Sequence, residues 1–159
     1  MTAKIGVSYS TSHDSGDAGR EMASKAMVNA GLERADLALV FASTEHDAES
    51  LLKSVKSVTG DDCIIAGGTS SGVITGDYLG YEGFHAGIMV VSDPDIRFRT
   101  EVIEGIDCDE YRAGKEMGRK LAFLNEYEDP ALLLFYDGMR NQPARLKMFN
   151  EAAPILRGM

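Results

Sequence analysis

The sequence predicts an α/β fold with a mixed sheet: a parallel β-α-β-α-β start, then an antiparallel hairpin and flanking helices. Three observations support this. Residues 4–8, 35–44 and 63–67 are apolar runs with the length of strands. The segments between them show helical periodicity, and strands joined through helices are usually parallel. Residues 83–103 instead contain two alternating runs around a turn, which is typical of a hairpin with one solvated face.

The first unit runs from residue 4 to about residue 32. KIGVS (4–8) predicts a strand, and the polar segment after it favours a turn. From Asp17 to Leu32, small and apolar residues recur every four positions, so a helix is expected there, with Gly31 placed to end it.

The second unit repeats this order. ADLALVFAST (35–44) predicts a strand covered on both faces. Thr44-x-x-Asp47 has the spacing of a capping box and predicts the start of the next helix. CIIAG (63–67) predicts the third parallel strand.

After Gly72 the chain is dense in glycine and tyrosine, which predicts a loop or short irregular strands. Residues 83–92 and 96–103 are expected to form the hairpin, with Asp93-Pro94-Asp95 as its turn. A helix is predicted over 109–125, with Gly114 and Gly118 as points of close packing.

The last segment resembles the second unit. DPALLLFYDG (129–138) predicts a strand, and a helix with Pro143 near its first turn should follow. The sequence stops at Met159, where a returning strand and its glycines would begin. We therefore expect residues 1–159 to be one domain of a longer chain.

Composition excludes several classes of partner. The formal net charge of −9 argues against nucleic acid and anionic membranes, which attract basic surfaces. No segment approaches the roughly 18 apolar residues of a spanning helix, so a cytoplasmic protein is predicted.

His13-Asp14 and His46-Asp47 lack a third metal ligand and are interpreted as turn and cap residues. Neither a metal nor a cofactor is expected.

The stretch IIAGGTSSG (64–72) has two interpretations. Gly68-x-Ser70-x-Gly72 matches the nucleophile elbow of serine hydrolases, which needs a helix after the serine and a later histidine. The run after Ser70 is β-prone instead, and His85 is the one later histidine. A half-exposed strand position is the simpler interpretation of His85. A hydrolase using Ser70 is kept as an alternative.

The other interpretation is a ligand cradle. Gly67, Gly68 and Gly72 would let backbone N–H groups approach a ligand, and Thr69, Ser70 and Ser71 offer hydroxyls. The carboxyl ends of parallel strands meet at one edge, the usual location of sites in such sheets. That edge is predicted to gather the cradle residues with Ser8, Ser43, Asp47 and Asp137, of which the two aspartates could meet an ammonium group. Capping and turn roles remain open for Thr44, Asp47 and Asp137, and Tyr78 or Tyr81 could form a lid.

Several of these motifs together resemble a known family. GVSYS (6–10), ADLALVF followed by Ser43 and His46-Asp47, IIAGGTSSG (64–72) and FHAGIMVV resemble, in this order, the N-terminal half of FIST sensory domains (F-box and intracellular signal transduction). The resemblance covers most of the chain. It implies that a second FIST domain follows and that the pair senses small ligands, with amino acids suggested. The family has no established catalytic residues to carry over, so no enzyme is expected.

The predicted function is therefore a cytoplasmic sensory domain for signal transduction that binds a small polar ligand. The expected partners are that ligand and a second FIST domain or downstream signalling domain. Besides the hydrolase, a ligand-free interaction module that packs through its glycine- and tyrosine-rich segment remains an alternative.

Overall fold

The computed structural model describes residues 2–106, 108–136, 155–157 and 159. The chain divides into two compact units, Met1–Thr100 and Glu101–Met159. The first contains the sheet and the two helices predicted from the start of the sequence, and the candidate site lies in it. Within the described ranges, no helix combines the length and apolar composition needed to cross a bilayer.

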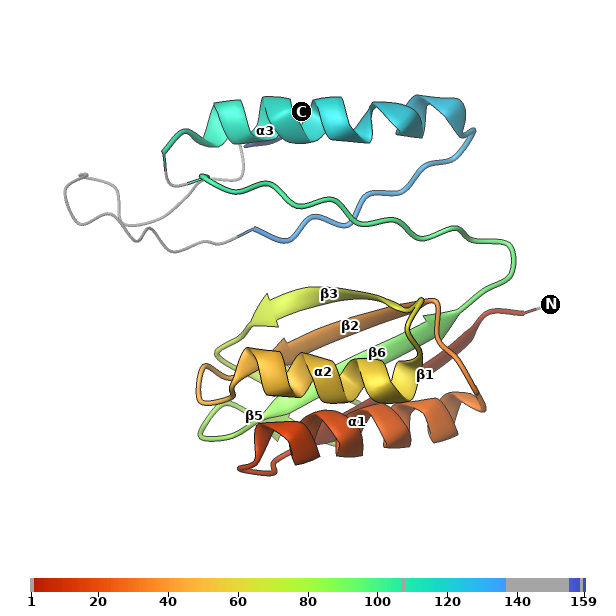
Figure 1. The fold of residues 1–159 in the computed structure, drawn as a ribbon, viewed down its shortest axis with the longest axis vertical. Coiled ribbons are helices and arrows are strands. Elements are labelled where there is room, and N and C mark those ends of the chain that lie inside the picture. Colours follow the sequence, from red (N-terminus) through yellow and green to blue (C-terminus); the bar gives the residue numbers. More distant parts are fainter. Residues whose placement is uncertain (1, 107, 137–154, 158) are drawn as a thin grey trace. The chain divides into compact units, whose positions relative to one another are not determined.

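The first unit is built on a four-stranded mixed sheet with the order β1-β6-β2-β3. Its strands are β1 (Lys4–Ser10), β2 (Leu37–Ala42), β3 (Ile64–Thr69) and β6 (Ala86–Ser92). β2 and β3 pair in parallel, whereas β6 is antiparallel to both β1 and β2. β1, β2 and β3 therefore run in one direction with β6 inserted between the first two (Figure 1). This confirms the mixed sheet and its parallel start.

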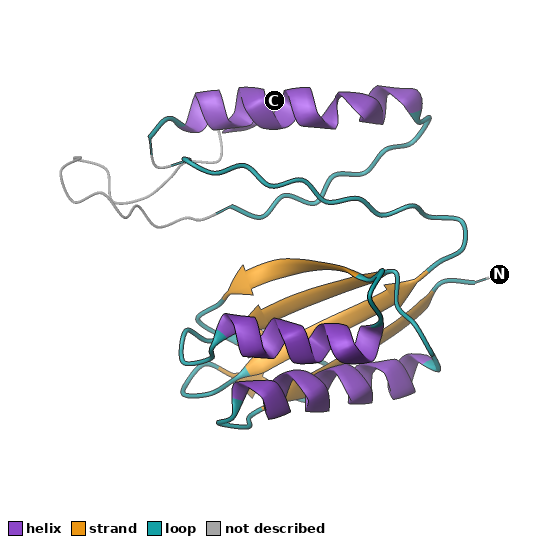
Figure 2. Cartoon of the chain, viewed as in Figure 1, coloured by secondary structure: helices purple, strands orange, loops and turns teal. Residues whose placement is uncertain are grey.

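Helices α1 (Ser15–Ala30) and α2 (Ala48–Thr59) pack side by side on one face of this sheet (Figures 1 and 2). Their apolar stripes bury Met22 and Val55 against Val40 of β2 and Ile88 of β6. Burial of each such side chain contributes about 1.5–3 kcal/mol, so this interface stabilises the sheet that carries the candidate site.

The ends of both helices are fixed by local chemistry. Asp14 caps α1 by accepting from the N–H of Asp17, and Gly31, with φ 61°, ends the helix as predicted. Asp47 caps α2 by accepting from the N–H of Ser50. The predicted capping box starting at Thr44 is wrong, because α2 begins three residues later than that spacing requires.

The chain between β3 and β6 forms a small antiparallel hairpin of β4 (Val73–Ile74) and β5 (Leu79–Gly80). This confirms the prediction of short irregular strands after Gly72.

The second strand predicted at 96–103 is wrong, since no strand forms there. Both edges of β6 are already occupied by β1 and β2, so the segment after the turn has no free edge of β6 on which to pair. β6 is also buried along most of its length, so it lacks the predicted solvated face.

The second unit contains α3 (Glu110–Lys120) followed by the 3₁₀ helix η1 (Leu121–Glu126), as the helix prediction required. A Cβ on Gly114 would lie 2.1 Å from the carbonyl oxygen of Ile155, and one on Gly118 would lie 2.5 Å from that of Met159. Both glycines are therefore points of close packing, as predicted.

The predicted strand at 129–138 is wrong over residues 129–136, which form no ladder within the described residues. Asp137 and the helix predicted around Pro143 lie outside the described residues.

Candidate functional site

β2 and β3 end, and β6 begins, in one row at an edge of the sheet. Ala42 of β2 is opposite Ala86 of β6 on one side and Thr69 of β3 on the other. The chain segments after β2, after β3 and before β6 are therefore neighbours. This is the carboxyl edge of the parallel strands, where sites in α/β sheets usually lie.

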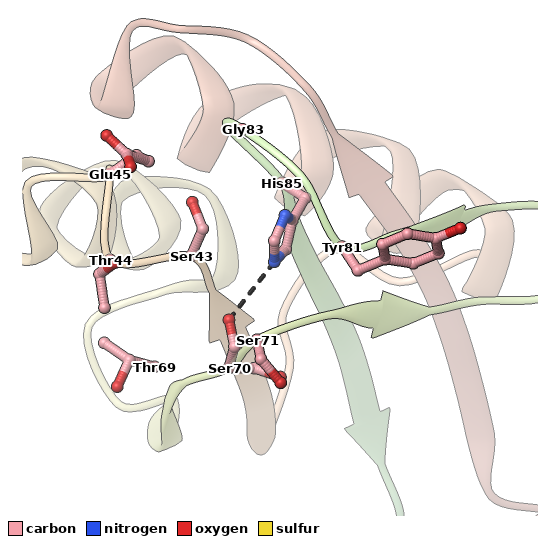
Figure 3. A pocket seen from close by; sticks show the side chains of 9 residues that line it. All are labelled: Ser43, Thr44, Glu45, Thr69, Ser70, Ser71, Tyr81, Gly83 and His85. Carbon is pink, nitrogen blue, oxygen red and sulfur yellow. Dashed lines mark hydrogen bonds between the residues drawn. The ribbon is translucent and has the colours of Figure 1, made fainter.

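These three segments surround a hollow of about 380 Å³. Figure 3 shows its lining: Ser43, Thr44 and Glu45 after β2, Thr69, Ser70 and Ser71 at the end of β3, and Tyr81, Gly83 and His85 before β6. The lining is rich in hydroxyl groups. Glu45 is its one carboxylate, and none of the nine residues is a lysine or arginine.

Ser70 fixes the shape of the glycine turn. Its N–H donates to the carbonyl oxygen of Ala42 over 2.8 Å, which extends the β2/β3 ladder by one residue. Its Oγ accepts from the N–H of Gly72 at 3.3 Å and donates to the carbonyl oxygen of the same residue. The Ser70 hydroxyl is thus occupied within the turn.

His85 and Ser43 form the inner wall of the hollow. The N–H of Ser43 donates to the carbonyl oxygen of His85 over 2.8 Å, so the two residues continue the antiparallel β2/β6 ladder as an opposing pair. Ser43 is 7% exposed and His85 is 2% exposed. The interpretation of His85 as half-exposed is therefore wrong, because the inserted strand β6 carries it into the interior.

Two polar atoms of this pair have no hydrogen-bond partner in the described structure. His85 Nε2 lies 3.3 Å from the carbonyl oxygen of Ser70, but its Nδ1 is unpaired, and so is Ser43 Oγ. A buried polar group without a partner costs roughly 1–3 kcal/mol. Such groups at the wall of a hollow indicate a place where a ligand or water completes the hydrogen bonding.

A third unpaired atom, His46 Nε2, lies close by. The ring of His46 packs edge-on against Phe84, with centroids 5.4 Å apart, and its Nδ1 is 3.3 Å from Ser15 Oγ. Burial, and secondly the charge of His85, lower the pKa of His46 below its ordinary value. His46 is therefore held neutral at physiological pH.

The structure separates the residues predicted for the cradle. Ser43, Thr69, Ser70 and Ser71 line the hollow, as does Tyr81, one of the two tyrosines considered as a lid. The other, Tyr78, stacks on Tyr9 instead, at a centroid distance of 4.0 Å.

Two other predicted residues, Ser8 and Asp47, do not line this hollow. Ser8 is buried within β1, two residues before the strand ends. Asp47 lines a second hollow between the starts of α1 and α2, together with His13, Asp14, Ser15, Gly16 and Ser50. Asp137 lies outside the described residues.

The glycines have different roles. Gly67 has φ 140°, and a Cβ there would lie 1.8 Å from the carbonyl oxygen of Val40, so close approach of β2 and β3 requires it. A Cβ on Gly68 would meet nothing within 4 Å, and one on Gly72 would contact Tyr81 and Gly80. Only Gly68 thus faces open space.

Three lining residues were not predicted as ligand contacts: Glu45, Gly83 and His85. They follow β2 or precede β6, and only the pairing of these strands brings them to the cradle. The one available signal was a polar residue within a few positions after a buried strand, which applies to Glu45 as it does to Ser43.

The surroundings of Ser70 differ from a nucleophile elbow. β3 is followed by the short strand β4, where an elbow has a helix. His85 approaches the carbonyl oxygen of Ser70 while the hydroxyl is engaged with Gly72. The two His-Asp pairs do not converge on a metal either: the described residues contain no cluster of three or more histidine, cysteine, aspartate or glutamate side chains able to bind one.

Comparison with known families decides the assignment. The family model of the FIST N domain matches residues 36–156, which contain the hollow and most of the chain. The chain belongs to the FIST family. FIST domains are sensory domains of signal transduction, and the family resemblance found in the sequence is thereby confirmed.

This FIST domain has no match among curated proteins. Among solved structures it is similar to the FtsZ W319Y mutant of M. jannaschii, with 18% identity over 56% of this chain and 26% of that one, and a TM-score of 0.36. It is also similar to thiamine-monophosphate kinase from Stenotrophomonas maltophilia, with 12% identity over 82% of this chain and 46% of that one, and a TM-score of 0.42. The chain therefore spans less than half the length of either structure.

Proposed function

We propose that this FIST domain is a cytoplasmic sensor that binds a small polar metabolite, of the amino acid class, in the hollow between Ser43, Thr69 and His85. Its role is binding and not catalysis. The observation that supports this most directly is the pair of buried atoms without partners, Ser43 Oγ and His85 Nδ1, at the wall of a polar hollow. A volume of about 380 Å³ is within the usual range of small-ligand sites.

The lining offers groups for both ends of an amino acid. Thr69 and Ser71 present hydroxyls that can donate to a carboxylate, and Glu45 presents a carboxylate that attracts an ammonium group. The hydroxyls lie at the end of β3 and Glu45 lies after β2. A bound ligand would therefore link two separate segments of the sheet edge.

Signalling would follow from that link. A ligand that bridges the β2 and β3 ends stabilises one arrangement of these segments, which is how binding energy becomes a conformational signal. The recipient in this proposal is a second FIST domain or a downstream signalling domain.

A thermal-shift scan with the common amino acids and related carboxylates tests the proposal. Ligand at 100 times its Kd stabilises a protein by about 2.7 kcal/mol, which for a chain of this size raises Tm by roughly 5–10 °C. We expect such a shift with one or a few amino acids. No shift with any of them would contradict the proposal and favour the ligand-free interaction module.

Matched variants locate the site once a ligand is found. Thr69→Val removes a lining hydroxyl at nearly constant shape and should raise Kd about tenfold, the effect of about 1.4 kcal/mol. Thr75→Val is the control, since the Thr75 hydroxyl lies 3.4 Å from Asp77 and outside the lining. Unchanged affinity in both Thr69→Val and Ser71→Ala would remove the turn from the site.

A separate measurement addresses catalysis by Ser70. The protein is incubated with a chromogenic ester and a serine-directed phosphonate. We expect neither turnover nor a mass adduct, because the Ser70 hydroxyl donates to the backbone of Gly72. An adduct on Ser70 would restore the hydrolase hypothesis.

A further inference from the structure

The inner wall of the hollow has a definite hydrogen-bonding polarity. Its two unpaired atoms, His85 Nδ1 and Ser43 Oγ, belong to side chains that are more than nine-tenths buried. The chemistry of these two atoms limits which functional group can bind against them.

The polarity of His85 follows from its other ring nitrogen. Nε2 lies 3.3 Å from the carbonyl oxygen of Ser70, and a carbonyl oxygen can only accept. In the neutral form of the ring, the proton is therefore on Nε2. Nδ1 then presents a lone pair, so the buried ring offers an acceptor to the hollow.

Ser43 stands directly across the ladder from His85 and on the same face of the sheet. Opposing residues of an antiparallel pair have Cβ atoms about 4.5–5.5 Å apart. One small group can thus reach both side chains at once. The serine oxygen adds two more lone pairs, so together the two side chains present more acceptor sites than donors.

The charge of the lining also favours a group that donates hydrogen bonds over an anion. Glu45 is the one ionised side chain of fixed sign among the lining residues, and it is negative. A carboxylate at the inner wall would face the lone pair of His85 Nδ1 and would have no lysine or arginine among those residues to balance it. A group rich in N–H bonds meets favourable partners at each of these positions.

We propose that the inner wall formed by Ser43 and His85 is a subsite for a group with two or three N–H donors, either a primary ammonium or a primary amide. This inference rests on the proposed function, because it takes the hollow as the ligand site. It adds the orientation of the ligand within the hollow. The nitrogen end of the ligand points inward to Ser43 and His85, and any carboxylate stays outside near Thr69 and Ser71.

The test uses three probes of similar shape: propylammonium, butyramide and butyrate. Each is titrated into the full chain, labelled with ¹⁵N in the histidine rings, and the His85 Nδ1 signal is followed by NMR. For ligands of so few atoms a Kd on the order of millimolar is expected. We expect saturable shifts of the His85 signal with propylammonium, butyramide or both, at a Kd at least about tenfold below that of butyrate. Comparing the first two probes distinguishes a charged from a neutral donor.

Two variants accompany the titration. Ser43→Ala should weaken the binding of the N–H probe several-fold. Ser57→Ala makes the same change on α2, where the Ser57 hydroxyl is bonded to the carbonyl oxygen of Ser54, and should have no effect. The comparison of probes on the unmodified chain decides the question even if Ser43→Ala fails to fold.

Two results would overturn the proposal. One is binding of butyrate as tight as that of the N–H probes. The other is no shift of His85 with any probe, which would mean that the two side chains satisfy each other or bind only water.

These failures are separable from failure of the proposed function. An amino acid that stabilises the protein while butyrate is the better fragment would keep the sensor and reverse the ligand's orientation. N–H probes that shift His85 while every amino acid is silent would keep the subsite and remove the amino acid class.

Discussion

Replacing Ser43 with alanine should make the ligand-free protein more stable. The Ser43 side chain is 7% exposed and its Oγ has no partner in the described structure. An unsatisfied buried hydroxyl costs roughly 1–3 kcal/mol. Removing it should recover part of that cost, about 1 kcal/mol, since a bound water offsets some of the penalty and the lost atom leaves a small gap.

Ser10 provides the matched control. It is also a buried serine at a strand end, 1% exposed, but its Oγ donates to Glu21 and accepts from the N–H of Ser12 at 3.1 Å. A hydrogen bond to a charged group contributes about 1.5–3 kcal/mol. Ser10→Ala should therefore destabilise the protein by roughly 1.5 kcal/mol.

The two variants thus differ in the sign of their effect. Both residues lie in the unit Met1–Thr100, for which 1 kcal/mol corresponds to a change in Tm of roughly 4 °C or more. Urea and thermal unfolding of the ligand-free protein would measure the difference. If Ser43→Ala lowers stability as much as Ser10→Ala does, Ser43 has an undetected partner and the argument for a ligand at the inner wall fails.

Two further predictions concern the framework of the site, and a third concerns the second unit. Gly67→Ala should destabilise the protein by more than about 3 kcal/mol, because its Cβ would lie 1.8 Å from the Val40 oxygen at φ 140°. Gly68→Ala should change stability by less than about 1 kcal/mol, because its Cβ would meet nothing within 4 Å. Denaturant unfolding of the two variants checks this, and similar losses of stability in both would contradict it. The folded-state pKa of His46 lies below its unfolded value, so its contribution to stability is complete above about pH 6.5 and is lost as the pH falls toward the folded pKa. His46→Phe should therefore make the free energy of unfolding depend less on pH over that window. An unchanged dependence on pH would refute the prediction. Gly114→Ala should release the packing of Ile155 against α3, seen as faster proteolysis after residue 150 with an unchanged first unit. Lys115→Ala, at an exposed position of the same helix, should leave that contact intact.

Much of the local structure was predictable from the sequence. Strands β1, β2 and β3, both helices of the first unit and the end of α1 at Gly31 follow from apolar periodicity and residue-specific backbone preferences. These signals act over a few residues, so they are visible in a single sequence. They were also sufficient to indicate that Ser43 and the Thr69–Ser71 turn meet at one sheet edge.

Only the tertiary structure decided where β6 lies. The run at 83–92 predicts a strand, but its partners at Lys4–Ser10 and Leu37–Ala42 are far away in the sequence and are selected by burial of the whole sheet. That pairing placed His85 opposite Ser43 and left residues 96–103 without an edge of β6 on which to pair. The glycine turn was thus determined by the sequence, whereas the histidine that completes the hollow was determined by a strand register that no local pattern specifies.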